Sequence, residues 1–450
     1  MQPGINQVMG ALLMAALVMG CDEPSGPDSE RRNTHAGAAV GMRQPSRDPQ
    51  GPEKSNLTAT TQPDDQLNSA SSPPFPAPPA ASDAKTPSPN TRAPLAAALG
   101  KRPVSPAGNG KGATVSSAIT PPADLLERAK NGESLAQRDL GKFYADHGQL
   151  RDAVQWYWEA ASQGDAEAQR ILGLAYLFGQ GVVRDMEEAG NWLLLSAMQN
   201  DAIAQRELGK IFGDQWRFEE SNDWLLKAAL QGDAEAQRML GMRYTIGQGV
   251  ESDRQEAVKW FHQAANQGDA LAQRELGKYY GELWNLQESN KWYLMAAENG
   301  DVRAQHMMGV RCTFGQGVER DLQKAGQWFL LAAEQGDAQS QYSIGLRWLR
   351  GEVGEPRDFA EAAKWFQLAA EQGLDEAQLS LGRRYAQGEG VEQDLVEAYK
   401  WVALAQEQGK VKGAGKALSE MATQMTGEQI EEARARAAAF SAKSPSPISR

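Results

Sequence analysis

The chain has 450 residues and a formal net charge of -12 at pH 7, which argues against a general nucleic-acid binder, because such proteins present net positive charge to phosphates. Its composition is segregated: 18 of the 22 prolines lie between Pro24 and Pro122, and all 12 tryptophans lie between Trp156 and Trp401. The first part therefore lacks the large apolar residues that form a hydrophobic core, whereas the second part is rich in them.

The first residues have the pattern of a bacterial secretory signal. An apolar run from Val8 to Met19, too short to span a bilayer, is followed by Gly20 and Cys21. The stretch LVMGC resembles a lipoprotein lipobox, which implies a signal peptide over residues 1–20 and a lipid attached to Cys21. We therefore expect a periplasm-facing, lipid-anchored envelope protein, in either the inner or the outer membrane. The alternative is an uncleaved apolar tail on a cytoplasmic protein.

Residues 21–123 are dominated by Pro, Ser, Ala and Thr. Such a segment cannot offset its ordering entropy by burying apolar surface, so we expect it to be disordered. The stretch SSPPFPAPPAAS at its centre has a composition that can dock in aromatic grooves, although a spacer is the simpler interpretation. Flexible-coil scaling gives a mean reach of roughly 55 Å, so the segment is predicted to be a tether.

One short motif recurs from residue 124 onward. GDAEAQR stands at Gly164–Arg170 and again at Gly232–Arg238. Related copies define eight units, which start near residues 132, 164, 200, 232, 268, 300, 336 and 373. Units of 32 and 36 residues alternate, so that two units make a 68-residue block. Periods of this size indicate a stacked array, and the sequence predicts an all-α solenoid of eight helix hairpins over residues 124–409.

Each unit has the pattern of two helices joined by a loop. Gly164 suits a left-handed residue that closes one helix, and Asp165 suits the N-cap of the next. A glycine inside the first helix, Gly173 in this unit, recurs in every unit and implies close approach of a neighbouring helix. Asp185 is expected to cap the second helix, with Glu188 completing a capping box. The same pairing recurs at Asp253 and Glu256, Asp358 and Glu361, and Asp394 and Glu397.

The stretch GDAEAQRMLGMRYTIGQGVESDRQEAVKWFHQAANQ resembles a Sel1-like repeat (SLR), a relative of the tetratricopeptide repeat. The 36-residue unit and the patterns A-x-A-Q-x-x-L-G, Y-x-x-G-x-G-V and A-x-x-W-F-x-x-A-A all match. The resemblance covers about Leu125 to Gly409. It implies a superhelix whose concave face, lined by the first helix of each unit, binds a partner protein or peptide. Residues 410–440 resemble the closing helices of the family, and residues 441–450 are expected to be frayed.

Signals of catalysis are scarce. The four histidines do not stand at metal-ligand spacing, no nucleotide or nucleophile-elbow fingerprint is present, and we predict no metal and no cofactor. SDAK at Ser82–Lys85 matches the Ser-x-x-Lys of penicillin-recognising enzymes, but it lies in the segment expected to be disordered. An enzyme or binder acting on β-lactams or peptidoglycan is the alternative function, and a passive envelope spacer is a third.

Basic residues recur where the ligand-contacting positions of the family project from the first helix. They are Arg138, Arg170, Arg206, Arg238 and Arg274, with Lys142, Lys210 and Lys278 one turn later in the short units. A repeated like-charge pair is mildly unfavourable, which raises the hypothesis of a basic ladder that binds carboxylates of an acidic partner. The alternative is surface ion pairing inherited through duplication, because each lysine has an acid four residues later and three of the arginines directly precede an acid.

Two tryptophans stand at a turn. Trp216 and Trp284 occupy the position where the first short unit has Gly148. Aromatic residues at such a place are candidate exposed anchors for a partner, and packing against the loop of the next unit is the alternative. The sequence therefore predicts a non-enzymatic protein-interaction scaffold, without identifying the partner or the oligomeric state.

Overall fold

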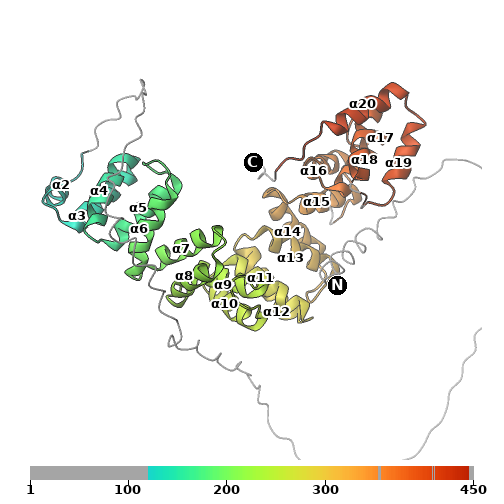
Figure 1. Cartoon of the computed structure of the whole chain (residues 1–450). Helices are drawn as coiled ribbons and strands as arrows, with labels where there is room; N and C mark the ends of the chain where they lie inside the picture. Colours follow the sequence, from blue (N-terminus) through green and yellow to red (C-terminus); the bar gives the residue numbers. More distant parts are fainter. Residues whose placement is uncertain (1–119, 353–355, 408, 410, 445–450) are drawn as a thin grey trace, which may run out of the picture. The chain divides into compact units, whose positions relative to one another are not determined.

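The computed structural model describes residues 120–352, 356–407, 409 and 411–444. The predicted signal peptide, Cys21, the SDAK stretch and residues 21–119 of the predicted tether lie outside the described residues. Within the described ranges the chain forms nineteen helices and no strand (Figure 1). Sixteen of these helices form eight hairpins, here called repeats 1 to 8, each with an A helix and a B helix.

The A helices are α3 (Ser134–Asp146), α5 (Ala166–Phe178), α7 (Ala202–Asp214), α9 (Ala234–Ile246), α11 (Ala270–Glu282), α13 (Val302–Phe314), α15 (Ala338–Arg350) and α17 (Asp375–Gln387). The B helices are α4 (Leu150–Ser162), α6 (Met186–Met198), α8 (Phe218–Leu230), α10 (Arg254–Asn266), α12 (Leu286–Glu298), α14 (Leu322–Glu334), α16 (Phe359–Glu371) and α18 (Leu395–Glu407). Helix α2 (Ala123–Lys130) precedes the hairpins, and α19 (Ala414–Ala422) and α20 (Gly427–Ala438) follow them.

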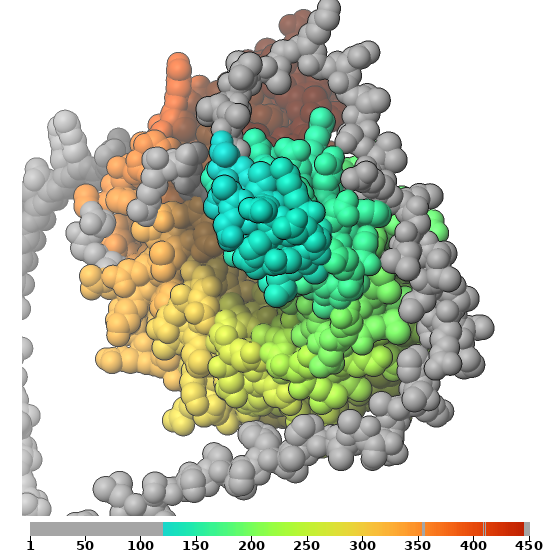
Figure 2. Space-filling model, turned by 90° about the vertical axis from the view of Figure 1, so that its left-hand side faces the viewer, coloured from blue at the N-terminus to red at the C-terminus, as the bar shows by residue number. Residues whose placement is uncertain are grey.

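Successive helices pack as a stack. Each A helix packs against the B helix of its own repeat, and each B helix packs against the A helix of the next repeat. Helix α2 packs against α3 at one end, and α19 and α20 both pack against α18 at the other. The space-filling view shows the repeats following one another in sequence order (Figure 2). The prediction of an all-α solenoid of stacked hairpins is confirmed.

The helices are uniform in length. Every helix from α3 to α18 has 13 residues. At about 1.5 Å per residue such a helix is roughly 20 Å long, shorter than the roughly 30 Å hydrocarbon layer of a bilayer. In the part of the chain that the structure describes, no helix is long and apolar enough to cross a membrane.

The hydrophobic core is shared between neighbouring repeats. In one cluster Tyr157 of repeat 1 packs with Leu172 and Trp192 of repeat 2, and all three side chains are buried. Full burial of such a side chain contributes about 1.5–3 kcal/mol. A single hairpin would leave half of this cluster in water, so the repeats are stabilised by stacking on one another.

The recurring glycine of the A helices lies against a B-helix side chain. A Cβ atom placed on Gly241 would lie 2.6 Å from Cε1 of Phe261, and one on Gly173 would lie 2.7 Å from Cγ of Leu193. These distances are shorter than carbon–carbon contacts allow, so only glycine lets the two helices approach this closely. The predicted close approach is confirmed.

The predicted capping boxes are wrong at α6, α10 and α16. Asp185 does cap α6, because its Oδ1 atom accepts hydrogen bonds from the amides of Glu187 and Glu188. However, the N-cap amide of each of these three helices donates to a main-chain carbonyl near the end of the preceding A helix, at 3.0–3.1 Å, rather than to a glutamate of its own helix. At α10 the carboxylate of Glu256 instead accepts a hydrogen bond of 2.7 Å from Lys259. The amide of Asp253 itself donates to the carbonyl of Tyr244 in α9 at 3.0 Å, so the N-cap amide is not available to Glu256.

Candidate functional site

The recurring seven-residue motif joins each repeat to the next. In repeat 4, Gly232 adopts a left-handed φ of 93° and Asp233 then caps α9, its Oδ1 atom accepting the amide of Ala236 at 2.8 Å. Arg238, which ends the motif, donates to Oδ2 of Asp269 in repeat 5 at 3.1 Å. The arginine of one copy thus binds the capping aspartate of the next copy, which gives a physical reason for the repetition.

The glutamine of the motif forms a second inter-repeat link. Gln237 is buried, and its amide donates to the carbonyl of Ala229 in repeat 3 at 3.0 Å. Its own carbonyl accepts a hydrogen bond of 2.8 Å from Gln267, at the end of α10. Buried amides must be hydrogen-bonded to be tolerated, and here both ends of the side chain are satisfied by neighbouring elements.

All five arginines of the predicted basic ladder make the inter-repeat contact. The pairs are Arg138–Asp165, Arg170–Asp201, Arg206–Asp233, Arg238–Asp269 and Arg274–Asp301, at 2.8–3.1 Å. The acids next in sequence contribute in three cases, namely Arg138–Asp139, Arg206–Glu207 and Arg274–Glu275. The structure therefore places the ladder arginines on the joints between repeats, and partner binding by them stays a prediction.

The lysines of the ladder differ from one another. Lys210 lies 3.1 Å from Glu207 and 2.8 Å from Glu235, rather than pairing with the acid four residues later. Lys142 and Lys278 form no salt bridge with any described residue. Burial alone would raise the pKa of Glu235, but the hydrogen bond from Lys210 and the charge of Arg206 lower it.

Repeat 6 replaces the ladder arginine with a histidine. Nδ1 of His306 lies 2.9 Å from Oγ of Ser340 and 3.4 Å from Oδ2 of Asp337, the capping aspartate of repeat 7. Burial lowers the pKa of His306, and the charge of Asp337 only partly opposes this effect. The joint between repeats 6 and 7 is therefore held by a titratable group.

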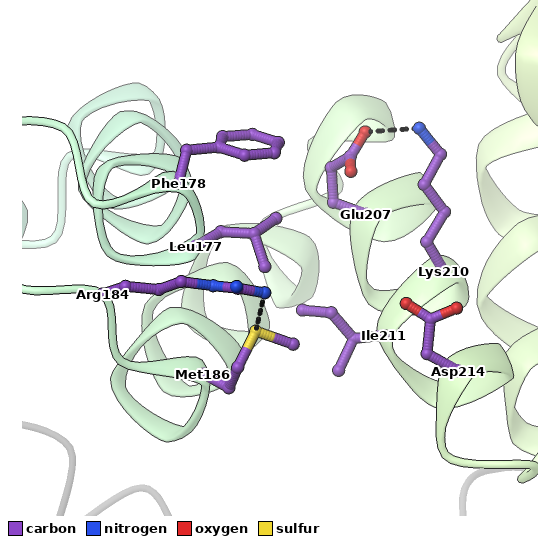
Figure 3. Close-up of a pocket in the computed structure, with 8 residues that line it drawn as sticks. All are labelled: Leu177, Phe178, Arg184, Met186, Glu207, Lys210, Ile211 and Asp214. Atoms are coloured by element: carbon purple, nitrogen blue, oxygen red, sulfur yellow. Dashed lines mark hydrogen bonds and ion pairs between the residues drawn. The ribbon is translucent and has the colours of Figure 1, made fainter. Parts of the chain in front are cut away.

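A hollow of about 470 Å³ opens between repeats 2 and 3 (Figure 3). It is lined by Leu177, Phe178, Arg184 and Met186 from repeat 2 and by Glu207, Lys210, Ile211 and Asp214 from α7. The two sets face each other, and Leu177, Met186 and Ile211 extend toward one another across the space (Figure 3). The volume lies within the range of roughly 300–1,000 Å³ that is typical of ligand-binding clefts.

The duplicated block supplies an internal comparison for this hollow. Sixty-eight residues later, the counterparts of Met186, Ile211 and Asp214 are Arg254, Tyr279 and Glu282. There Arg254 forms a salt bridge with Glu282 and lies over the ring of Tyr279, 4.9 Å from its centroid. The side chain of Arg254 therefore occupies this place in repeats 4 and 5. In repeats 2 and 3 the equivalent residue is Met186, which is uncharged.

Two charged groups of the hollow are not used in salt bridges. Glu207 and Lys210 pair with each other. Arg184 and Asp214 have no salt-bridge partner among the described residues, and Nη2 of Arg184 lies 3.8 Å from Sδ of Met186. The hollow thus combines an apolar interior with the cation of Arg184 and the anion of Asp214. Burial lowers the pKa of the nearby Arg243, and the charge of Asp214 opposes this effect. Sequence reasoning missed this site, although comparing the two copies of the block reveals the Met186 and Arg254 difference.

Trp216 and Trp284 are exposed rather than packed against the next loop. Their exposed fractions are 80% and 74%. Both adopt left-handed backbone conformations, with φ of 62° and 59°, where repeat 1 has Gly148 at 72°. A bulky residue in this region costs about 1–3 kcal/mol, and strain of this kind concentrates at functional sites. The two tryptophans therefore form a second candidate site.

In the described ranges, no group of three or more His, Cys, Asp or Glu side chains is placed to hold a metal ion. His262 instead forms a hydrogen bond of 3.1 Å with the hydroxyl of Tyr280 and contacts Trp292 edge to face. Burial lowers the pKa of His262. This histidine therefore belongs to the packing of repeats 4 and 5.

Comparison with known proteins concerns the repeats themselves. The family model described as Sel1 repeat matches eight consecutive segments, residues 134–165, 166–201, 202–233, 234–269, 270–301, 302–337, 338–374 and 375–410. A solved Sel1 repeat protein from Oxalobacter formigenes is 30% identical, with 66% of this chain and 89% of that chain covered and a TM-score of 0.52.

Two other solved structures are similar. The protective antigen c5321 of uropathogenic Escherichia coli strains, which displays an SLR fold, is 28% identical, with 70% of this chain and 78% of that chain covered and a TM-score of 0.46. The immunity protein Pa5087 from Pseudomonas aeruginosa is 20% identical, with 47% and 82% covered and a TM-score of 0.31.

Proposed function

This chain belongs to the Sel1 repeat family, and on that premise we propose that it is a non-enzymatic scaffold that binds a partner protein in the hollow between repeats 2 and 3. Sel1 repeat proteins are generally scaffolds for protein interactions. The observation that carries the proposal is that this hollow is open, whereas its duplicated counterpart contains the side chain of Arg254.

The lining of the hollow defines the chemistry of the partner. A large apolar side chain would pack among Leu177, Met186 and Ile211, and its burial would contribute about 1.5–3 kcal/mol. An acidic group of the partner would bind Arg184, and a basic group would bind Asp214. The proposed ligand is therefore an extended peptide segment with an apolar anchor between charges of opposite sign.

The partner is proposed to continue along the A helices, the face that the sequence predicts to be concave. Arg206 and Lys210 lie on α7, the helix that also supplies Ile211 and Asp214 to the hollow. The salt bridges of Arg206 hold α7 against α9, so the ladder would keep the binding surface in a fixed shape. Pre-organisation of this kind lowers the entropic cost of binding.

We also propose that the scaffold is tethered in the bacterial envelope. The support is the lipobox-like LVMGC before and at Cys21, together with the tether composition of residues 21–123. Metabolic labelling with a radioactive fatty acid tests this proposal in cells. Label that enters the wild-type chain and is absent from Cys21→Ala supports it, and equal labelling of both chains contradicts it.

Substituting residues of the hollow by their counterparts in repeats 4 and 5 tests the binding site. Met186→Arg, Ile211→Tyr and Asp214→Glu together introduce into repeats 2 and 3 the three residues that make the Arg254 contacts in repeats 4 and 5, and leave Leu177, Phe178 and Arg184 unchanged. In-cell crosslinking followed by mass spectrometry should recover a partner with the wild-type chain and lose it with this triple variant. The matched control makes the reverse changes, Arg254→Met, Tyr279→Ile and Glu282→Asp, and should keep the partner.

Equal recovery of the partner by the two triple variants would contradict binding in the hollow. The non-enzymatic part of the proposal is tested separately with purified chain. Hydrolysis of nitrocefin or of muropeptides above the rate in buffer would contradict it and would support the enzymatic alternative.

A further inference from the structure

The two exposed tryptophans stand at turns that carry an excess of negative charge. We call the turn edge the four segments that run from the last residue of an A helix to the third residue of the B helix in repeats 2 to 5, namely residues 178–188, 214–220, 246–256 and 282–288. These segments contain eleven acidic residues and three arginines, an excess of eight in a chain whose net charge is -12. Trp216 and Trp284 lie in the second and the fourth segment. The turn edge therefore combines indole surface with negative charge.

The packing of the folded repeats does not account for these tryptophans. They are the two most exposed large apolar side chains of the described residues, although Trp216 contacts the ring of Phe218 edge to face. Both hold a backbone conformation that glycine adopts without strain, as Gly148 does in repeat 1. Exposed aromatic residues kept at an energetic cost are typical of binding surfaces.

Elsewhere in the repeats, cations of the chain itself lie over indole rings. In repeat 3, Nζ of Lys227 is 3.8 Å from the ring centroid of Trp224, and in repeat 8, Nζ of Lys400 is 4.3 Å from that of Trp401. A cation in this position is attracted by the negative charge on the ring face. Among the described residues no cation lies over either tryptophan of the turn edge. Their ring faces are therefore open to a cation supplied by a partner.

Carboxylates of the turn edge are also open to a partner. Glu219 lies three residues after Trp216, and Glu251 lies in the turn of repeat 4, between the turns of the two tryptophans. Both glutamates are exposed, and neither forms a salt bridge with a described residue. The neighbouring cation Arg217 is already used, because it pairs with Glu220 and lies over the ring of Phe212. The chain therefore leaves part of this negative charge without a cation.

We propose that the turn edge binds a basic segment of a partner protein. Arginine or lysine side chains of that segment stack on Trp216 and Trp284. Their charge is balanced by Glu219 and Glu251. Arginine fits best, because its planar guanidinium group stacks on an indole and donates to a carboxylate at the same time.

Charge complementarity distinguishes this occupant from others. A second copy of the chain carries the same net charge of -12 and would be repelled. The phosphates of nucleic acids and of anionic lipids would be repelled by the same carboxylates. A basic peptide is attracted by these charges and also finds the ring faces that a cation requires.

The inference does not depend on the hollow between repeats 2 and 3. Trp216, Trp284, Glu219 and Glu251 are not among the residues that line it. A partner that fills the hollow and also carries a basic segment would gain affinity from this second contact.

Fluorescence anisotropy of labelled peptides tests the inference on the purified full chain. One probe alternates arginine with serine, and the other has the same length and alternates glutamate with serine. We expect the arginine peptide to bind and the glutamate peptide not to bind. Trp216→Gly together with Trp284→Gly should weaken binding of the arginine peptide by about tenfold. Glycine suits the backbone of both turns, and circular dichroism verifies that the helices are intact.

Two pairs of glutamate variants separate local from overall charge. Glu219→Gln with Glu251→Gln should weaken binding of the arginine peptide by about threefold. The matched control is Glu127→Gln with Glu428→Gln, which removes the same charge from two exposed glutamates of α2 and α20 that form no salt bridge with a described residue. The control should bind the arginine peptide as the wild-type chain does.

Three results with the peptides would overturn the inference: no binding of the arginine peptide, unchanged affinity of the double tryptophan variant, or equal losses in the two glutamate pairs. Two further measurements test the other occupants. Dimers in sedimentation of the wild-type chain that are lost in the double tryptophan variant would assign the turn edge to a second copy. Flotation with phosphatidylcholine vesicles that is lost in the same variant would assign it to a membrane, and either result would also overturn the inference.

Discussion

Nη1 of Arg206 lies 2.8 Å from Oδ2 of Asp233, while Oδ1 of the same carboxylate caps α9 through the amide of Ala236. One aspartate therefore starts a helix and also holds the preceding repeat in place. Burial by itself would lower the pKa of Arg206, but the charge of Asp233 and the hydrogen bond to Glu207 raise it. The charged guanidinium group of Arg206 thus links repeats 3 and 4 by its ion pair with Asp233.

Arg206→Ala is expected to destabilise the fold. It leaves the largely buried carboxylate of Asp233 without its cation, and losing hydrogen bonds to a charged group costs about 1–3 kcal/mol. Urea unfolding followed by circular dichroism measures the effect. Arg217→Ala, which removes a half-exposed salt bridge with Glu220, is the control and should change stability by less than about 1 kcal/mol. Equal stability of the two variants would show that the ladder is not structural.

Gly241→Ala and Gly190→Ala should change stability in opposite directions. A Cβ atom on Gly241 would meet the ring of Phe261 at 2.6 Å, and overpacking of this kind costs about 1–3 kcal/mol. Gly190 lies inside α6 with no atom within 4 Å of an added Cβ, so alanine there should stabilise the helix by about 0.5–1 kcal/mol. Thermal melting of the two variants checks the prediction, and a shift in the same direction for both would refute it.

Trp216→Gly should raise the melting temperature. Glycine adopts the left-handed conformation of this turn without a steric cost, and the lost indole buries little surface. The expected gain is about 1 kcal/mol, the lower end of the strain that such a conformation carries in other residues. A melting temperature below that of the wild-type chain would mean that Trp216 contributes packing to the fold.

The joint between repeats 6 and 7 should weaken in acid. Burial lowers the folded-state pKa of His306 below its value of 6.5 in the unfolded chain. The unfolded chain therefore takes up the proton more readily, so this contribution to stability is full above pH 6.5 and is lost as the pH falls through the folded pKa. His306→Gln, which cannot titrate, should lose less stability than the wild-type chain between pH 7.5 and pH 5. Equal losses in urea unfolding at the two pH values would contradict this assignment.

Much of the fold follows from local rules in the sequence. Gly164, Asp165 and Gly173 were predictable because helix ends and close helix contacts demand particular residue types. The glycine inside the A helix recurs in all eight repeats, and the capping aspartate in six, since repeats 1 and 8 have Glu133 and Leu374 in its place.

The capping box failed at Glu256 because the N-cap amide of Asp253 donates to the carbonyl of Tyr244 in the preceding helix, and the carboxylate of Glu256 accepts from Lys259 instead. The rule considers only residues of one helix.

The site was less predictable than the fold. Arg138 and Asp165 are 27 residues apart, and Arg170 and Asp201 are 31 apart, so their pairing depends on how one hairpin rests on the next. The sequence does contain a signal, because the copies of the motif in repeats 2 to 5 each carry both an aspartate and an arginine. The hollow depends on a smaller difference, in which Met186 leaves open the space that Arg254 occupies one block later.

Hydrogen exchange of the chain with and without the partner recovered by crosslinking tests the proposed binding site most directly. The account predicts slower amide exchange in residues 174–187 and 207–217, which border the hollow, and unchanged exchange in the corresponding residues 242–255 and 275–285 of the second block. Protection of the second block alone, or equal protection of both, would contradict the hollow between repeats 2 and 3 as the site where this scaffold binds its partner.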